Sequence, residues 1–170
     1  MLSRTDSIGD VMLTLPMAGQ LRRTFPKCRI IFLGRTYTRD VIRVCRHVDE
    51  FVNYDELLEN AAAARKTMIK SWKADVFFHV FPRPDIAWMT LRARVPHRVG
   101  TRSRWYHWFT CNHRVPLHRK HSRLHESQLN LKLLRCLNVH AWAPLEEIPS
   151  LYGFDNVPAP DDTVASLTDA

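Results

Sequence analysis

The sequence is poor in glycine, with five among 170 residues. It lacks both GxGxxG, the pattern of dinucleotide-binding turns, and GxxxxGK[ST], the pattern of phosphate-binding loops. No stretch approaches the ~20 consecutive apolar residues that span a bilayer. Charges at Arg4, Asp6 and Asp10 also interrupt any apolar core of a secretory signal. These absences argue against a nicotinamide-dependent dehydrogenase, a P-loop nucleotidase and an integral membrane protein.

Cysteine is scarce and scattered. None of the four forms a CxxC pair, so we expect neither a disulfide framework nor a structural zinc site, and we expect reduced thiols in a cytosolic protein. The four are Cys28, Cys45, Cys111 and Cys136.

Acidic residues are outnumbered, and one long window has none. The chain holds 25 Lys and Arg against 17 Asp and Glu, a net charge of +8, which favours anionic partners. Residues 86–125 contain no Asp or Glu, but they carry arginines, histidines and four closely spaced aromatic residues, Trp105, Tyr106, Trp108 and Phe109. Two interpretations need no enzyme: a solvated basic face over an ordinary aromatic core, or a surface that holds phosphates and stacks bases.

Strand-like and helix-like segments alternate along the chain. Apolar strands that alternate with helices indicate a parallel sheet covered on both faces, so the predicted fold is α/β, Rossmann-like and doubly wound. Residues 1–4 have the character of the end of a strand. The predicted strands are 29–33, 51–54, 75–81 and 98–100, and the predicted helices are 10–25 (with Pro16 inside), 38–46, 55–72 (capped by Asp55), 85–94 and 124–137.

The first strand-to-helix turn, residues 4–10, is the first place to look for chemistry, because ligands of open α/β sheets bind at the carboxyl ends of strands. Gly9 allows a tight turn, and Asp10 places a carboxylate at the helix N-terminus, where it would repel a phosphate. Asp10 has two interpretations, a helix N-cap and a general base that takes a proton from a hydroxyl group. The helix dipole would make it a modest base.

This turn resembles the opening motif of the heptosyltransferases, the glycosyltransferase family 9 enzymes that assemble the lipopolysaccharide core from ADP-heptose. The similarity extends over about residues 1–139. The matching segments are RTDSIGDVMLTLP at 4–16, LRRTFP at 21–26 with the following strand, HVDEF at 47–51, RVPHRVG at 94–100 and HE at 125–126.

The resemblance implies the N-terminal, acceptor-side half of a GT-B enzyme, in which two Rossmann-like domains face a cleft and the sugar is transferred with inversion. Residues 1–143 would form this domain, with a clipped first strand, and residues 144–170 a linker and the start of a donor domain outside the sequence. Asp10 would be the catalytic base. Ser7, Gly9, Arg102 and Arg104 would contact the acceptor, the last two because they follow the fifth strand.

The same resemblance implies an anionic glycolipid acceptor and an ADP-heptose donor bound by the other domain, with no cofactor and no metal in this chain. It places the enzyme in the cytoplasm, peripheral on the inner face of the inner membrane, and makes nucleic acid an unfavoured partner. The 170 residues alone are then expected to be inactive. The alternative function is a non-enzymatic basic α/β module that binds nucleic acid or another polyanion.

The histidines give weak signals. His118, His121 and His125 have a spacing that a metal site could use, but no cysteine or carboxylate precedes Glu126 nearby, so zinc is disfavoured. His79 lies within an apolar strand and is expected to be a hydrogen-bonded core histidine.

Overall fold

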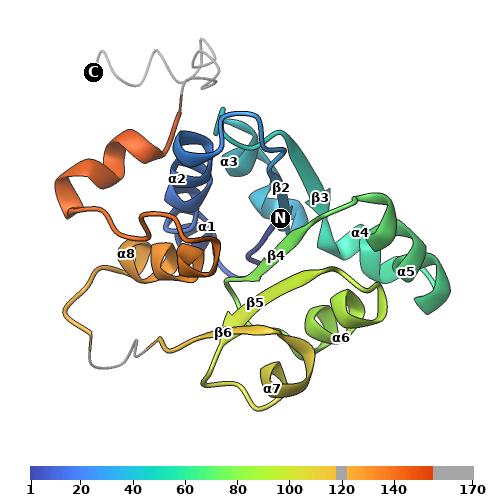
Figure 1. Cartoon of the computed structure of the whole chain (residues 1–170). Coiled ribbons are helices and arrows are strands. Elements are labelled where there is room, and N and C mark those ends of the chain that lie inside the picture. The colour runs from blue at the N-terminus through green and yellow to red at the C-terminus, as the bar shows by residue number, and fades with distance from the viewer. Residues whose placement is uncertain (118–121, 155–170) are drawn as a thin grey trace, which may run out of the picture.

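The computed structural model describes residues 1–117 and 122–154, which form one six-stranded sheet with helices on both faces (Figure 1). All strand pairs are parallel, and the order across the sheet is β3-β2-β1-β4-β5-β6. The Rossmann-like, doubly wound fold predicted from the sequence is confirmed. The strands are β1 (Leu2–Ser3), β2 (Ile31–Gly34), β3 (Glu50–Asn53), β4 (Val76–His79), β5 (His97–Thr101) and β6 (His113–Val115).

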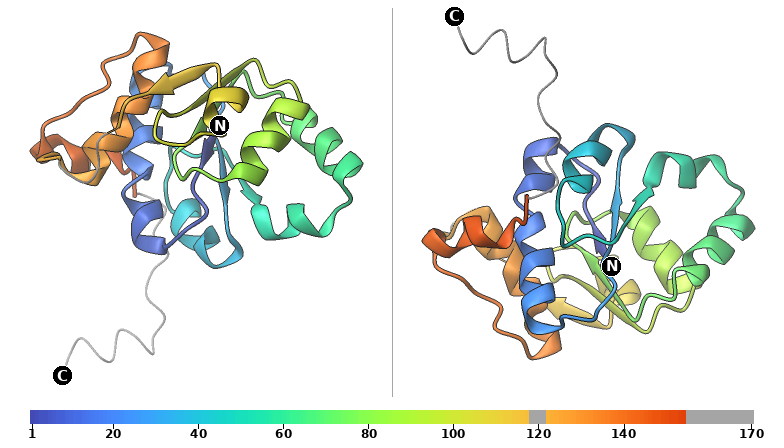
Figure 2. Two further views of the ribbon diagram at one scale, coloured as in Figure 1. Left: turned by 90° about the horizontal axis from the view of Figure 1, so that it is seen from below. Right: turned by 90° about the horizontal axis from the view of Figure 1, so that it is seen from above.

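The helices form two layers (Figures 1 and 2). One layer holds α1 (Ile8–Met12), α2 (Leu15–Thr24), α3 (Arg39–Arg43) and α8 (Glu126–Leu131), and the other holds α4 (Tyr54–Glu59), α5 (Ala62–Ser71), α6 (Pro84–Arg92) and α7 (His107–Thr110). Short 3-10 helices are η1 (Thr36–Thr38), η2 (Lys132–Leu137) and η3 (Leu145–Leu151). Side chains of the apolar strands pack into a hydrophobic core on each face of the sheet. Because both faces are buried, these strands do not alternate apolar with polar residues.

The strand order reverses between β1 and β4. From β1 the chain builds the sheet in one direction, through β2 to β3. It then returns to the other side of β1, where it forms β4, and continues in the opposite direction to β5 and β6. Leu2 pairs with Phe32 on one side and Phe78 on the other, so β1 is central although it has two residues. In such sheets the crevice at the reversal, outside the carboxyl ends of the strands, is the usual ligand site.

Pro16 divides the helix predicted for residues 10–25. Helix α1 ends at Met12, and α2 begins at Leu15 with Pro16 in its first turn, where a missing N–H costs nothing. The single helix predicted for residues 10–25 is thus two helices, and the first of them begins at Ile8.

Two other long helices are interrupted. The predicted helix over residues 55–72 is wrong in its continuity, because Asn60 adopts an extended conformation between α4 and α5. Its predicted cap is also wrong, since the side chain of Asn53 accepts the backbone N–H of Asp55. Over 124–137, α8 passes into the 3-10 helix η2. Helix α7 and strand β6, inside the basic window, were not predicted.

The segment that begins at Pro144, predicted as a linker, starts with an ordered part. Helix η3 packs on α2 and contributes Ile148 and Leu151 to the core. The backbone of Leu151 comes so close to Gly19 that a Cβ built on the glycine would lie 2.1 Å from the Leu151 carbonyl oxygen. Residues 145–151 therefore pack with the first domain. The remainder of the predicted linker, 155–170, lies outside the described residues, and the boundary at 143 stays a prediction.

The four cysteines are free thiols, and Cys45 and Cys111 are buried. Among residues 1–117 and 122–154, no helix is long and apolar enough to cross a membrane.

Candidate active site at the carboxyl end of β1

The turn after β1 is held by a reciprocal pair of hydrogen bonds. The Ser7 hydroxyl accepts the backbone N–H of Asp10 (3.2 Å) and donates to the Asp10 carboxylate at Oδ2 (2.7 Å). Ser7 is thus the N-cap of α1 and Asp10 lies in the first turn, so the interpretation of Asp10 as the cap is wrong. The one hydroxyl proton of Ser7 is used by Asp10, which gives Ser7 a role in positioning the carboxylate. A contact between Ser7 and the acceptor stays a prediction.

Arg4 is the buried centre of the site. Its guanidinium lies 2.6 Å from Asp10 Oδ1 through Nη2 and 2.7 Å from Asp6 Oδ1 through Nε, while Nη1 lies 3.7 Å from Glu126 Oε1. The Arg4 side chain is 4% exposed, and that of Asp10 is 37% exposed. The planar fork of an arginine suits such a set of carboxylates. The buried cation therefore holds Asp10 in place while one side of that carboxylate faces solvent.

The two neighbouring aspartates differ in their acidity. The hydrogen bond from Ser7 and the charge of Arg4 outweigh partial burial and lower the pKa of Asp10. Burial raises the pKa of Asp6, against the influence of Arg4. Asp10 is therefore ionised at neutral pH. An ionised carboxylate has about four acceptor positions, of which Ser7 and Arg4 use two, so room is left for a substrate hydroxyl.

The site lies at the strand-order reversal. The Arg4 guanidinium sits over the ring of Phe81, just after β4, with 5.8 Å from Cζ to the ring centroid. On the other side, the Tyr37 hydroxyl donates to the backbone oxygen of Asp6 at 2.6 Å. Residues that follow β1, β2 and β4 thus converge around one exposed carboxylate. This is the arrangement that the crevice of a doubly wound sheet is expected to supply.

Gly9 is exposed within α1 and is not required by the backbone. A Cβ on it would meet Ser7 Oγ at 3.9 Å, an ordinary contact. Gly9 leaves open space beside the turn that carries Asp10. A contact between Gly9 and the acceptor stays a prediction.

Arg102 and Arg104 are exposed beyond the end of β5. Neither forms a hydrogen bond or ion pair with residues 7–10 in the described part of the chain. Strand β5 lies two positions from β1, so about 10 Å separates the two strand ends. Arg102 also lines an open hollow of about 450 Å³ with Arg114 and Arg135. The two arginines are thus not joined to the Asp10 turn, and their contact with an acceptor stays a prediction.

The histidines are distributed differently from the predicted cluster. His118 and His121 lie outside the described residues, and His125 caps α8 by accepting the N–H of Ser127. Within residues 1–117 and 122–154, no group of three or more His, Cys, Asp or Glu is arranged to hold a metal.

His79 is a buried core histidine, as expected, with one of its two ring nitrogens paired. Its Nε2 lies 3.4 Å from Thr90 Oγ1, while Nδ1 has no hydrogen-bond partner. Burial, with the charges of His107 and Arg98, lowers the pKa of His79 to about 3.

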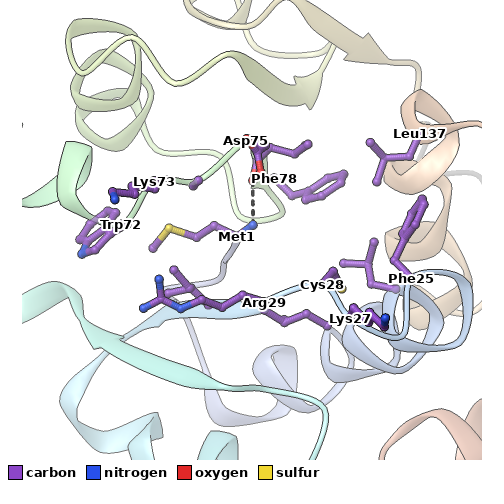
Figure 3. A pocket seen from close by; sticks show the side chains of 15 residues that line it. Met1, Phe25, Lys27, Cys28, Arg29, Trp72, Lys73, Asp75, Phe78 and Leu137 are labelled. Atoms are coloured by element: carbon purple, nitrogen blue, oxygen red, sulfur yellow. Dashed lines mark hydrogen bonds between the residues drawn. The ribbon is translucent and has the colours of Figure 1, made fainter.

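A hollow of about 480 Å³ lies at the opposite, amino-terminal edge of the sheet (Figure 3). Phe25, Trp72 and Phe78 line it, and the Met1 amine beside them donates to the carbonyl of Val76 at 2.7 Å. Ligands of parallel sheets bind at the carboxyl edge, so we do not assign the active site here.

Sequence reasoning overlooked the partners of Asp10. Arg4 and Asp6 lie at the carboxyl end of the first predicted strand, close to Asp10 in the sequence. Their position could have indicated that they interact with Asp10. Glu126 is 116 positions from Asp10 and no local pattern connects them. Only the packing of α8 against α2 brings it to Arg4.

The known proteins to which this chain is similar are glycosyltransferases. No family model matches the chain. A Haemophilus influenzae protein named "Putative glycosyltransferase" is 23% identical over 154 residues, which cover 89% of this chain and 44% of that protein. The chain therefore spans less than half the length of this curated relative.

Solved structures share the fold. Escherichia coli heptosyltransferase WaaC with ADP-2-deoxy-2-fluoro heptose superimposes with a TM-score of 0.66 at 14% identity, over 93% of this chain and 54% of that one. E. coli ADP-heptose LPS heptosyltransferase II has a TM-score of 0.64 at 16% identity, and the match covers 98% of this chain and 48% of that one. A glycosyl transferase family 9 protein of Veillonella parvula has a TM-score of 0.67 at 16% identity, and the match covers 81% of this chain and 41% of that one. The chain thus has the Rossmann-like α/β fold that occupies about half of a GT-B heptosyltransferase, which confirms the resemblance in fold.

Proposed function

We propose that this chain is the acceptor-binding unit of an inverting glycosyltransferase that moves a heptose from ADP-heptose to an anionic lipopolysaccharide-core acceptor. The observation that supports this most directly is an ionised, half-exposed carboxylate, Asp10, fixed by Ser7 and a buried Arg4 at the strand-order reversal. The relationship to glycosyltransferases, and the ADP and ADP-heptose named for the solved structures, support the substrate class.

In the proposed reaction, Asp10 accepts the proton of an acceptor hydroxyl as its oxygen attacks the anomeric carbon. The new bond forms on the face opposite the leaving group, the bond from that carbon to ADP breaks, and ADP departs with the electron pair. Because the pKa of Asp10 is low, it is a modest base, and proton transfer is useful mainly once the attacking hydroxyl has become acidic in the transition state. Arg4 and Ser7 keep the carboxylate aimed at the crevice. Arg102 and Arg104 would hold anionic groups of the same acceptor.

The test is substitution of Asp10→Asn in the full-length enzyme, assayed for turnover with ADP-heptose and a delipidated core acceptor. The amide keeps the size of the side chain and removes the base, so we expect a loss of about 100-fold or more. Asp40→Asn is the matched control, because Asp40 is also an exposed aspartate in the first turn of a helix, α3. Near wild-type turnover of Asp10→Asn would reject the assigned role.

A further inference from the structure

The most exposed aromatic side chains of the described residues gather on one short segment. Trp105, Trp108 and Phe109, in and just before α7, are 70%, 56% and 69% exposed. The rings of Trp105 and Phe109 lie 6.5 Å apart, and Trp108 belongs to the same short helix as Phe109, so the three are called the ridge below. Leaving three large aromatic rings this exposed to water is unfavourable, because apolar surface gains free energy when it is buried. A ridge of this kind marks an interaction surface.

The ridge adjoins the basic hollow along the β6 edge. Arg114 stacks on Trp108, with 4.9 Å from Cζ to the ring centroid, and the Trp108 indole donates to the backbone oxygen of Arg102 at 3.3 Å. Arg102, Arg114 and Arg135 line the hollow together with His113. The side chains of Arg102 and Arg135 form no hydrogen bond or ion pair within residues 1–117 and 122–154. Their charge is therefore available to a partner.

No Asp or Glu is among the described residues that line the hollow, and residues 86–125 contain none. The face formed by the ridge and the hollow, hereafter the α7 face, thus combines exposed indole rings with uncompensated guanidinium groups. Tryptophan prefers the boundary between lipid headgroups and acyl chains, and arginine binds lipid phosphates. A protein partner would need acidic residues opposite the hollow and an apolar pocket for the aromatic rings. An anionic bilayer offers phosphate groups for the arginines and an apolar interior for the rings along one flat surface.

We propose that the α7 face is a membrane-docking surface that lies on an anionic lipid bilayer, with the ridge at headgroup depth and the hollow on lipid phosphates. This goes beyond the proposed function and does not depend on it, since it concerns binding to lipid with no sugar acceptor present.

The experiment is co-sedimentation of the full chain with vesicles of equal parts phosphatidylcholine and phosphatidylglycerol, and with pure phosphatidylcholine vesicles. We expect binding to the anionic vesicles that weakens with added salt. The variant Trp105→Ser with Phe109→Ser should reduce partitioning more than about tenfold, and Arg102→Gln with Arg135→Gln about tenfold or more. The side chains concerned are exposed, so circular dichroism should show both variants folded.

Matched controls change the same chemistry elsewhere. Phe25→Ser removes an exposed ring at the amino-terminal edge, and Lys66→Gln with Lys70→Gln removes two exposed charges from α5. Both should bind vesicles as the unaltered chain does.

Lipids brominated on their acyl chains give an independent measurement. They should quench the fluorescence of the unaltered chain, and quenching should fall in Trp105→Phe with Trp108→Phe although binding persists. Absence of binding to anionic vesicles at low salt, or equal loss in the controls, would overturn the proposal. So would oligonucleotide binding that the same substitutions abolish while vesicles stay unbound, since it would assign the face to nucleic acid.

Discussion

Arg4 has an unusual position for a cation, buried at the end of a central strand among three carboxylates. Asp6, Asp10 and Glu126 lie around its guanidinium, and the rim of this cluster is open to solvent. Such an arrangement fixes a carboxylate more firmly than a surface ion pair can, because a buried arginine has few alternative orientations. The residue that orients Asp10 is thus only six positions from it in the sequence.

We expect Arg4→Met to lower the free energy of unfolding by about 3 kcal/mol, since the substitution leaves partly buried carboxylates without their cation. It should also raise the pKa of Asp10 by removing the charge that lowers it. Urea denaturation and carboxyl titration by NMR measure the two effects. Arg29→Met is the control: Arg29 pairs with Glu50 on the surface, and such pairs contribute about 1 kcal/mol or less. Equal destabilisation by the two variants would contradict this account of Arg4.

His79 should make stability depend on pH. In the unfolded chain a histidine takes up a proton near pH 6.5, but in the folded chain His79 does so only near pH 3 because it is buried. Between these values the unfolded state binds more protons, so stability is complete above pH 6.5 and falls as the pH falls. The slope is at most about 1.4 kcal/mol per pH unit for one group.

The measurement is the free energy of unfolding between pH 7 and about pH 5.5, above the range in which most carboxylates titrate. His79→Gln should flatten the dependence, while His107, whose pKa burial also lowers, leaves a residual slope of the same sign. A profile for His79→Gln as steep as that of the unaltered chain would contradict the prediction.

At the scale of elements, the contact between α2 and η3 couples the last described segment to the sheet. Gly19 faces the backbone of Leu151, and no larger residue fits between them. Residues 145–151 are therefore bound by shape as well as by the apolar side chains Ile148 and Leu151. The exact complementarity of a glycine and a passing backbone is invisible in a pattern of prolines and acids.

Gly19→Ala should therefore lower the free energy of unfolding by about 1–3 kcal/mol through overpacking, in spite of the better helix propensity of alanine. Gly9→Ala is the matched control, because Gly9 is also helical but a Cβ on it would lie 3.9 Å from the nearest atom, Ser7 Oγ. It should be neutral or stabilising by up to about 1 kcal/mol. Denaturation midpoints of the two variants give the comparison, and a stabilised Gly19→Ala would show that η3 is not held by this contact.

At the scale of the whole molecule, the turn that carries Asp10 and the donor site of the proposed enzyme are expected to be on separate units. The chain covers 41% to 54% of the solved heptosyltransferase-like chains described above. Its first strand-to-helix turn carries an acid where a phosphate would need free amides. The proposed enzyme thus brings acceptor and donor together across a cleft of which this sheet forms one wall.

We accordingly expect the 170-residue chain alone to transfer no sugar and to bind neither ADP nor ADP-heptose at micromolar concentration. Isothermal titration calorimetry of the folded chain measures this, with the full-length protein as the positive control. Micromolar binding of either nucleotide by the 170-residue chain would place a donor site in it. That result would reject the proposal that the acceptor and donor sites lie on separate units.

The sequence by itself determined the fold class and the turn at which a candidate site is expected. Apolar strands such as 76–79 must be buried on both faces and therefore specify a parallel, doubly covered sheet, and the turn at 4–10 follows a central strand. These features are local, because each depends on residues close together in the chain. The resemblance to heptosyltransferases likewise rested on contiguous motifs.

The tertiary structure alone decided which contacts hold the site. It made Ser7 the cap, joined Arg4 to Glu126 through the packing of α8 on α2, and interrupted the helix at Asn60. It also left Trp105, Trp108 and Phe109 outside the core, although aromatic residues in a sequence usually signal burial. In each case the outcome depends on which distant segment fills a given space, and hydrophobic periodicity carries no information about that choice.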